Sequence, residues 1–205
     1  MANGKVITGY SCPIVAKYSY QNSVISYSDA MPLARGVEVS MEVETGDATN
    51  FYANNTIAES VAGQFNGATA TLTIDGLKDA ARNLIAGITT TGSITVDGVA
   101  VSTVTYDDLQ VIPYVGIGFV VRYMENGVTS YAPVILPKAQ FSPEGLDAAT
   151  QGESVEFQTT ELVATVMRAD DANHSWKTIA ADQTTEAKAK AVIMTYFGAY
   201  PVITT

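Results

Sequence analysis

The stretch YMENGVTSYAPVILPKAQF, from Tyr123 to Phe141, places an Asn-Gly pair and two prolines in a strand-like pattern. Asn-Gly between two such runs is typical of a two-residue hairpin turn, because both turn positions need a positive φ. With Asn126 and Gly127 as the turn, one face of the hairpin is apolar along most of its length. Its cross-strand pairs are Tyr123 with Ser130, Val121 with Ala132, Phe119 with Val134, and Ile117 with Leu136. We expect this face to lie against the core.

The opposite face of the same hairpin is mixed in character and contains Gly116 and Gly118. A glycine inside a strand has no side chain to fill the space above it, so another surface is able to approach closely. The two glycines therefore leave room on this face for another surface.

The two prolines indicate which side of the second strand lacks hydrogen-bond donors. In this register its even-numbered residues direct their N–H groups at the first strand, so the missing donors of Pro133 and Pro137 face away from it. A strand that lacks donors along one side is typical of a sheet edge, which is either protected within a monomer or paired with a partner. The candidate inter-subunit edge consists of Pro133, Ile135 and Pro137.

The fold class predicted for the chain is mainly β, an antiparallel β-sandwich or barrel with one flanking helix, in a single domain over residues 1–205. Alternating runs and turn signals recur along it. The other expected strands are a hairpin of Pro13–Tyr20 with Val24–Ser28, short strands around Asp97-Gly98 within Thr89–Thr105, and Val155–Phe157 with Leu162–Met167 as one bulged strand.

Four segments are expected to lie around this β-domain. Residues 1–12 are predicted to form an N-terminal arm, and residues 45–67 a projecting polar loop that is poorly ordered in the free subunit. Residues 75–87 are predicted to form the flanking helix, with Asp75 as its N-cap and Gly87 at its end. Residues 185–205 form a C-terminal segment with helical composition up to Gly198.

Two strands combine an apolar face with a polar one. Val37–Glu44 and Ala68–Ile74 alternate strictly, which is typical of strands with one buried and one solvent-exposed face. The polar faces are expected to lie near each other and to form a candidate lumen-lining surface. Their residues are Glu38, Ser40, Glu42 and Glu44 on the first strand, and Thr69, Thr71 and Thr73 on the second.

Charge and composition exclude several classes of protein. The net charge is −10, and acidic residues outnumber basic ones ten to two between Glu38 and Asp108, which disfavours a protein that grips duplex DNA. No apolar run reaches the length of about 18 residues that a membrane span requires. The N-terminus lacks the apolar core of a signal peptide, and the single cysteine forms no internal disulfide, so folding in a cytoplasm is expected.

No catalytic, cofactor-binding or metal-binding site is predicted. His174 is the only histidine and lies in a polar turn, while Cys12 has no redox motif beside it. Asp170 and Asp171 do not have the spacing of a calcium loop, and the glycines form no phosphate-binding motif. Glu42 and Glu44 share a face, as any alternating acidic strand would place them.

An ordered series of segments resembles the major tail proteins of long-tailed bacteriophages with non-contractile tails. The resemblance extends from about Pro13 to Gly198. Its segments are VISYSDAMPLARGVEVSMEVETGDATNFYANNTIAES, GATATLTIDGLKDAARNLIAGI, YVGIGFVVRYMENGVTSYAPVILPKAQFSPEG and TQGESVEFQTTELVATV.

This resemblance implies a structural virion protein. Six copies would form a ring, inner sheets would join into a continuous barrel, and stacked rings would form the tail tube through which DNA is ejected without specific binding. It implies assembly in the bacterial host cytoplasm and contacts with tape-measure, terminator and distal tail proteins, but no catalytic residues. The alternatives are a ring protein of a secretion system or contractile tube, a monomeric β-sandwich that binds carbohydrate or a cell surface, and an enzyme.

Overall fold

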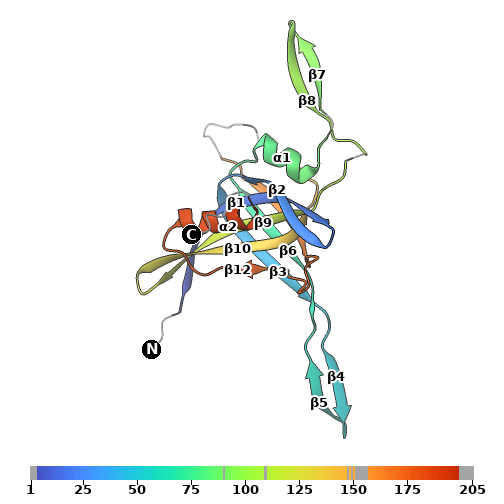
Figure 1. The fold of residues 1–205 in the computed structure, drawn as a ribbon, viewed down its shortest axis with the longest axis vertical. Helices are drawn as coiled ribbons and strands as arrows, with labels where there is room; N and C mark the ends of the chain where they lie inside the picture. The colour runs from blue at the N-terminus through green and yellow to red at the C-terminus, as the bar shows by residue number, and fades with distance from the viewer. Residues whose placement is uncertain are drawn as a thin grey trace.

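The computed structural model of the chain describes residues 4–89, 91–108, 110–146, 148, 150 and 157–198. A large antiparallel sheet forms the body, two short helices pack on it, and two separate hairpins project from opposite ends (Figure 1). The predicted mainly β fold with a flanking helix is confirmed.

The main sheet follows the order β2-β1-β9-β10-β11-β6-β3, and β12 pairs with β10 beside this path. Its strands are β1 (Val6–Gln21), β2 (Val24–Pro32), β3 (Gly36–Thr45), β6 (Phe65–Ile74), β9 (Val115–Glu125), β10 (Val128–Phe141), β11 (Thr160–Met167) and β12 (Thr178–Ile179). The path therefore ends at β2 on one side and at β3 on the other.

Strand β10 lies at the centre of the sheet, between β9 on one edge and β12 and β11 on the other. Along one edge it pairs with β9 from Val128 to Leu136 and again at Ala139, and along the other edge its last part, from Lys138, pairs with β11. The pairing with β9 shifts between Leu136 and Ala139, so Pro137 lies at this irregularity, where a missing N–H does least harm. Inward side chains of β1, β6, β9, β10 and β11 form the core, and Ala81 and Ile85 of α1 (Asp79–Ala86) pack against it.

The sequence prediction for the central hairpin is confirmed residue by residue. Strands β9 and β10 pair Tyr123 with Ser130 and continue in the expected register to Ile117 with Leu136. The turn residues Asn126 and Gly127 have φ values of 49° and 79°. This is the left-handed region that Asn-Gly adopts most readily, which explains why the register is so well specified.

The surface expected over the two strand glycines is helix α2 (Glu186–Tyr196) of the same chain. A Cβ placed on Gly116 would lie 2.5 Å from a ring carbon of Phe197, and one on Gly118 would lie 2.2 Å from Cγ2 of Ile193. Both partner side chains are fully buried in a second apolar cluster, on the face of β1, β9 and β10 opposite to the main core. The helix begins, as expected, where the Thr185 side chain accepts a hydrogen bond from the backbone N–H of Lys188.

The prediction that β10 offers a free edge to a partner subunit is wrong. The prolines do face away from β9, but the segment that follows β11 covers that side within the same chain: β12 pairs with Val134 and Ile135, and Tyr131 exchanges backbone hydrogen bonds with Gln183. The carbonyl of Pro133 accepts from the N–H of Ala180 at 3.0 Å. The proposed inter-subunit edge residues Pro133, Ile135 and Pro137 are all buried in the subunit.

Three predicted boundaries also differ from the structure. Much of the supposed arm at residues 1–12 belongs to β1, which pairs with β9 from Val6 onward through two register shifts. Helix α1 begins at Asp79, because Asp75 instead accepts hydrogen bonds from the backbone and the guanidinium of Arg35. Strand β11 begins at Thr160, and the preceding Val155 lies outside the described residues.

Candidate functional surfaces

The acidic face of β3 and the threonine face of β6 form one surface. The two strands are direct neighbours, and their pairing places Glu38 opposite Thr73 and Glu42 opposite Thr69, with Ser40 opposite Thr71 between them. Cross-strand partners point to the same side of a sheet, so these side chains alternate with a row formed by the partly buried Val39 and Met41 on β3 and their buried β6 partners. The structure thus brings together the residues that the sequence nominated as one surface. Glu44 continues the row at the end of β3.

Strand β11 extends the same surface, and the sequence analysis did not identify its contribution. Thr73 of β6 faces Glu161 on its other side, Thr71 faces Val163, and Thr69 faces Thr165. The strict alternation of buried and more exposed residues in β11 would have indicated this face had the strand been paired with β6 in advance. The surface of β3, β6 and β11, hereafter the acidic face, carries four glutamates, and these three strands contain no lysine, arginine or histidine.

Neither helix lies over the acidic face. Helix α2 packs on β1, β9 and β10, while α1 contacts β1 and β10 (Figure 1). Glu38, Ser40, Glu42 and Glu44 are exposed, and the threonines of β6 are half-buried only by their neighbours on the sheet. An open, acidic and hydroxyl-rich sheet face is therefore available for contact with solvent or with a polar ligand.

The first projecting hairpin replaces the predicted loop at 45–67. Strands β4 (Thr49–Ala53) and β5 (Thr56–Val61) pair around Asn54 and Asn55, whose φ values are 50° and 61°. The segment projects as expected, but it is a hairpin rather than an irregular loop. Every residue of its two strands is exposed. Large apolar side chains with no cover are Phe51, Tyr52, Ile57 and Val61.

The root of this hairpin is narrow and firmly attached to the body. A Cβ on Gly63 would lie 1.6 Å from the carbonyl oxygen of Gly46, so the two segments approach each other at a position where only glycine fits at residue 63. The backbone N–H of Gly46 donates to the carbonyl of Gln64 at 2.9 Å. Next to it, the ring of Phe65 stacks on Trp176 with centroids 4.3 Å apart and an interplanar angle of 7°. These contacts connect the base of the hairpin to the body.

The second projecting hairpin confirms the strands expected around Asp97-Gly98. It consists of β7 (Thr91–Val96) and β8 (Val99–Val104), and its pairing places Ile94 opposite Val101 and Val96 opposite Val99. These four aliphatic side chains share one face and are all exposed. A two-stranded hairpin is marginal by itself, and an uncovered apolar face is typical of a contact surface.

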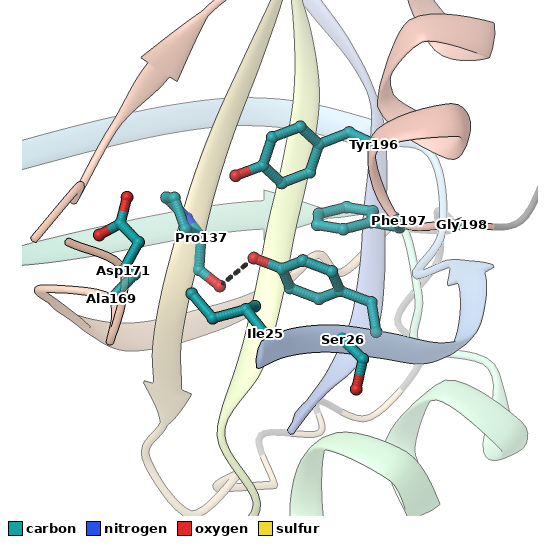
Figure 2. A pocket seen from close by; sticks show the side chains of 9 residues that line it. Ile25, Ser26, Pro137, Ala169, Asp171, Tyr196, Phe197 and Gly198 are labelled. Carbon is teal, nitrogen blue, oxygen red and sulfur yellow. Dashed lines mark hydrogen bonds between the residues drawn. The ribbon is translucent and has the colours of Figure 1, made fainter. Parts of the chain in front are cut away.

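An aromatic hollow lies where α2 meets β2 (Figure 2). Tyr27, Tyr196 and Phe197 surround it, and the Tyr27 hydroxyl donates to the carbonyl of Pro137 at 3.0 Å. The Tyr27 ring lies 4.9 Å from that of Phe197 and 5.8 Å from that of Tyr196, so two aromatic side chains at the end of α2 pack against it. Burial raises the pKa of Tyr27 above its ordinary value. These contacts attach the end of α2 to the sheet.

The two residues considered as catalytic candidates are Cys12, which forms a hydrogen bond within the fold, and His174, which lies in an exposed turn. The Cys12 thiol donates to Glu186 at 3.0 Å, and burial followed by this hydrogen bond raises the pKa of Cys12 to about 11, so the thiol is protonated at neutral pH. His174 is exposed in a turn with a φ of 51°. Over the described residues, no group of three or more His, Cys, Asp and Glu side chains is placed to hold a metal ion.

None of the helices in the described part of the chain is long and apolar enough to cross a membrane. No model of a known protein family matches the sequence, and a search of curated proteins also finds no match.

Proposed function

We propose that this chain is the tube-forming protein of a non-contractile bacteriophage tail, in which rings of six copies stack into a conduit for DNA. The observation that carries the proposal is the acidic face, an uncovered side of a well-ordered sheet with four glutamates and no basic residue on its strands. The order of sequence segments that resembles such tail proteins supports the same assignment.

The acidic face suits the wall of a channel for DNA. DNA carries one negative charge per about 1.7 Å of its axis, so a basic wall would hold it by releasing counterions. Carboxylates and hydroxyls give no such attraction, and salt screens repulsion beyond about 8–10 Å, so DNA passes without being held. In the proposed tube, Glu38, Glu42, Glu44 and Glu161 line the lumen.

The unpaired sides of the sheet suit ring formation. Because β12 covers β10, continuation of the sheet into a neighbouring copy would use β3 or β2, where the strand path ends. Use of β3 would place the acidic faces of successive copies side by side around a ring. Contacts between different patches on identical subunits close into rings or continue as helical assemblies.

Replacing Glu42 and Glu44 by lysine tests this orientation. Assembled tubes of the variant should retain a short DNA duplex in co-sedimentation, on the order of tenfold more than wild-type tubes at low salt, and should release it as NaCl rises. The control variant, Glu125→Lys with Asp108→Lys, makes the same change in net charge away from the acidic face. Equal retention by both variants would place Glu42 and Glu44 outside the lumen.

A further inference from the structure

A groove extends from the end of α2 to the turn of the β1–β2 hairpin, because two hollows adjoin there. The aromatic hollow of about 420 Å³ and a second one of about 610 Å³ share Ile25 and Asp171 as lining residues. Tyr196 lines only the first hollow, and Tyr20 lines only the second. Both volumes fall in the usual range for ligand sites, about 300–1,000 Å³. The two hollows together are hereafter the tyrosine groove.

The floor of the tyrosine groove is one face of the β1–β2 hairpin. The strand pairing places Tyr18 opposite Tyr27 and Tyr20 opposite Ile25, so these four side chains lie on the same side. Tyr18 is buried, and its hydroxyl donates to Asp170 at 2.7 Å, whereas Tyr20 near the turn is 45% exposed. The hairpin therefore presents an accessible aromatic ring at the end of a face that is otherwise packed into the fold.

The two walls of the groove come from distant parts of the chain. One wall is the end of α2, where Tyr196 is 40% exposed and its ring centroid lies 5.6 Å from that of Phe197. The other wall is the turn after β11, where Asp171 accepts hydrogen bonds from the N–H and the hydroxyl of Ser175, at 2.7 and 2.6 Å. Figure 2 shows the Tyr196 ring and the Asp171 carboxylate on either side of Pro137. An exposed ring and an oriented carboxylate thus line one hollow.

The polar groups of the groove favour a ligand that is rich in hydrogen-bond donors. Partial burial opposes the ionisation of Asp171, but the hydrogen bonds from Ser175 outweigh it and hold the pKa of Asp171 below its ordinary value. The carboxylate is therefore charged at neutral pH, and it accepts hydrogen bonds but donates none. Each of its oxygens still has a lone pair for a further donor. His174, exposed beside it, adds an imidazole that both donates and accepts.

A pyranose sugar matches these features. Its ring C–H groups stack on the electron-rich face of an aromatic side chain, and its hydroxyls donate to carboxylates at the edge of the ring. Sugars that carry acid groups are repelled by the groove carboxylates and by the net charge of −10. A proline-rich peptide also binds aromatic grooves, but proline has no N–H to donate. The groove therefore suits an uncharged glycan best.

We propose that the tyrosine groove binds an uncharged glycan, with one sugar ring against Tyr196, the next against Tyr20, and hydroxyls donating to Asp171. In the proposed tube α2 lies on the outside, so the groove is open to glycans of a cell surface. The inference goes beyond the proposed function and does not depend on it, because the whole groove lies within one subunit.

Saturation-transfer NMR on the full chain tests the groove with four uncharged probes: maltotriose, mannotriose, cellotriose and tri-N-acetylchitotriose. At least one probe should bind with a Kd of about 1 mM or tighter in calorimetric titration. An acidic probe, 3′-sialyllactose, should bind more weakly by about tenfold or more. Tyr20→Ala and Tyr196→Ala should each weaken binding of the uncharged probe on the order of tenfold. Tyr106→Ala removes a tyrosine that is 54% exposed and lies outside the groove, and should leave the Kd unchanged.

The inference is overturned if none of the four uncharged probes shows saturation transfer. It is also overturned if Tyr20→Ala binds as tightly as Tyr106→Ala, or if sialyllactose or a proline decamer binds better than every uncharged probe. If Tyr196→Ala does not fold, Tyr20→Ala decides, because Tyr20 lies at the exposed end of the hairpin face. Binding is measured on single subunits, so a chain that binds sugar but forms no tubes contradicts only the proposed function.

Discussion

Deletion of Asp47–Ala62, which joins Gly46 directly to Gly63, should leave a folded subunit that forms no tubes. The removed hairpin is exposed along both strands, so the core loses almost nothing. The new ends already lie next to each other, since the Gly46 N–H donates to the carbonyl of Gln64 at 2.9 Å, and Gly-Gly readily forms a tight hairpin turn. We therefore expect the free energy of unfolding to stay within about 1 kcal/mol of the intact chain.

Two measurements check this deletion. Urea denaturation followed by Trp176 fluorescence reports on folding, since the single tryptophan lies at the hairpin root, and electron microscopy reports on assembly. Phe51→Ser with Tyr52→Ser keeps the hairpin but removes its aromatic surface, and should also prevent tubes. Val128→Ser removes an equally exposed apolar residue outside both projecting hairpins and should not. Normal tubes from the deletion variant would show that this hairpin has no role in assembly.

Substitution of Gly118 by alanine should destabilise the subunit by about 1–3 kcal/mol, a typical cost of overpacking a close-packed interior. The added methyl group would lie 2.2 Å from Ile193 Cγ2, and Ile193 is fully buried between α2 and the sheet. Either α2 moves away from β9 or the strand shifts. A loss of this size lowers the melting temperature by about 2–4 °C per kcal/mol in a chain of this length.

Gly67→Ala is the matched control, because it makes the same chemical change in a strand of the same sheet. The nearest atom to a Cβ at Gly67 is the Val166 carbonyl oxygen at 3.9 Å, an ordinary contact. Alanine also restricts the unfolded chain more than glycine does, so this variant should be neutral or slightly more stable. Equal destabilisation by the two substitutions would contradict the close packing of α2 on Gly118.

The central hairpin could be predicted because its information is local. Asn126-Gly127 fixes the turn, the turn fixes the register, and the register places the proline nitrogens on the side away from β9. The room that the glycines were expected to leave is filled by a close neighbour. That neighbour is α2, which lies far along the chain, and nothing in the local pattern of Gly116 and Gly118 identifies it.

The prediction of a free edge along β10 was wrong because the strand that covers it also lies far along the chain. The covering strand β12 has only two residues, Thr178 and Ile179, and so short a strand has no periodicity to detect. The N-terminal part of β1 was missed because its alternation breaks at two register shifts, one of which contains Cys12 with a φ of 53°. Bulges interrupt the period-two pattern on which strand prediction depends.

The β4–β5 hairpin was predicted to project but not to form strands. Neither of its faces is buried, so its sequence has no alternation of apolar and polar residues for the pattern to reveal. Its signal is instead the Asn54-Asn55 pair, which adopts the left-handed turn that Asn-Gly adopts elsewhere in the chain. The sequence predicted the β3 and β6 parts of the acidic face, because both strands alternate strictly. It did not predict the contribution of Glu161, because the pairing of β11 with β6 cannot be read from the local sequence.

Cryo-electron microscopy of the purified, concentrated chain tests the central proposal most directly. The expected result is a population of tubes built from six-fold rings, with a central channel whose wall is the acidic face of β3, β6 and β11. In that map, Glu38, Glu42, Glu44 and Glu161 point at the channel axis, and α2 lies on the outside. A chain that stays monomeric at 21.7 kDa over the full concentration range, or tubes whose channel is lined by α2, would contradict the proposal.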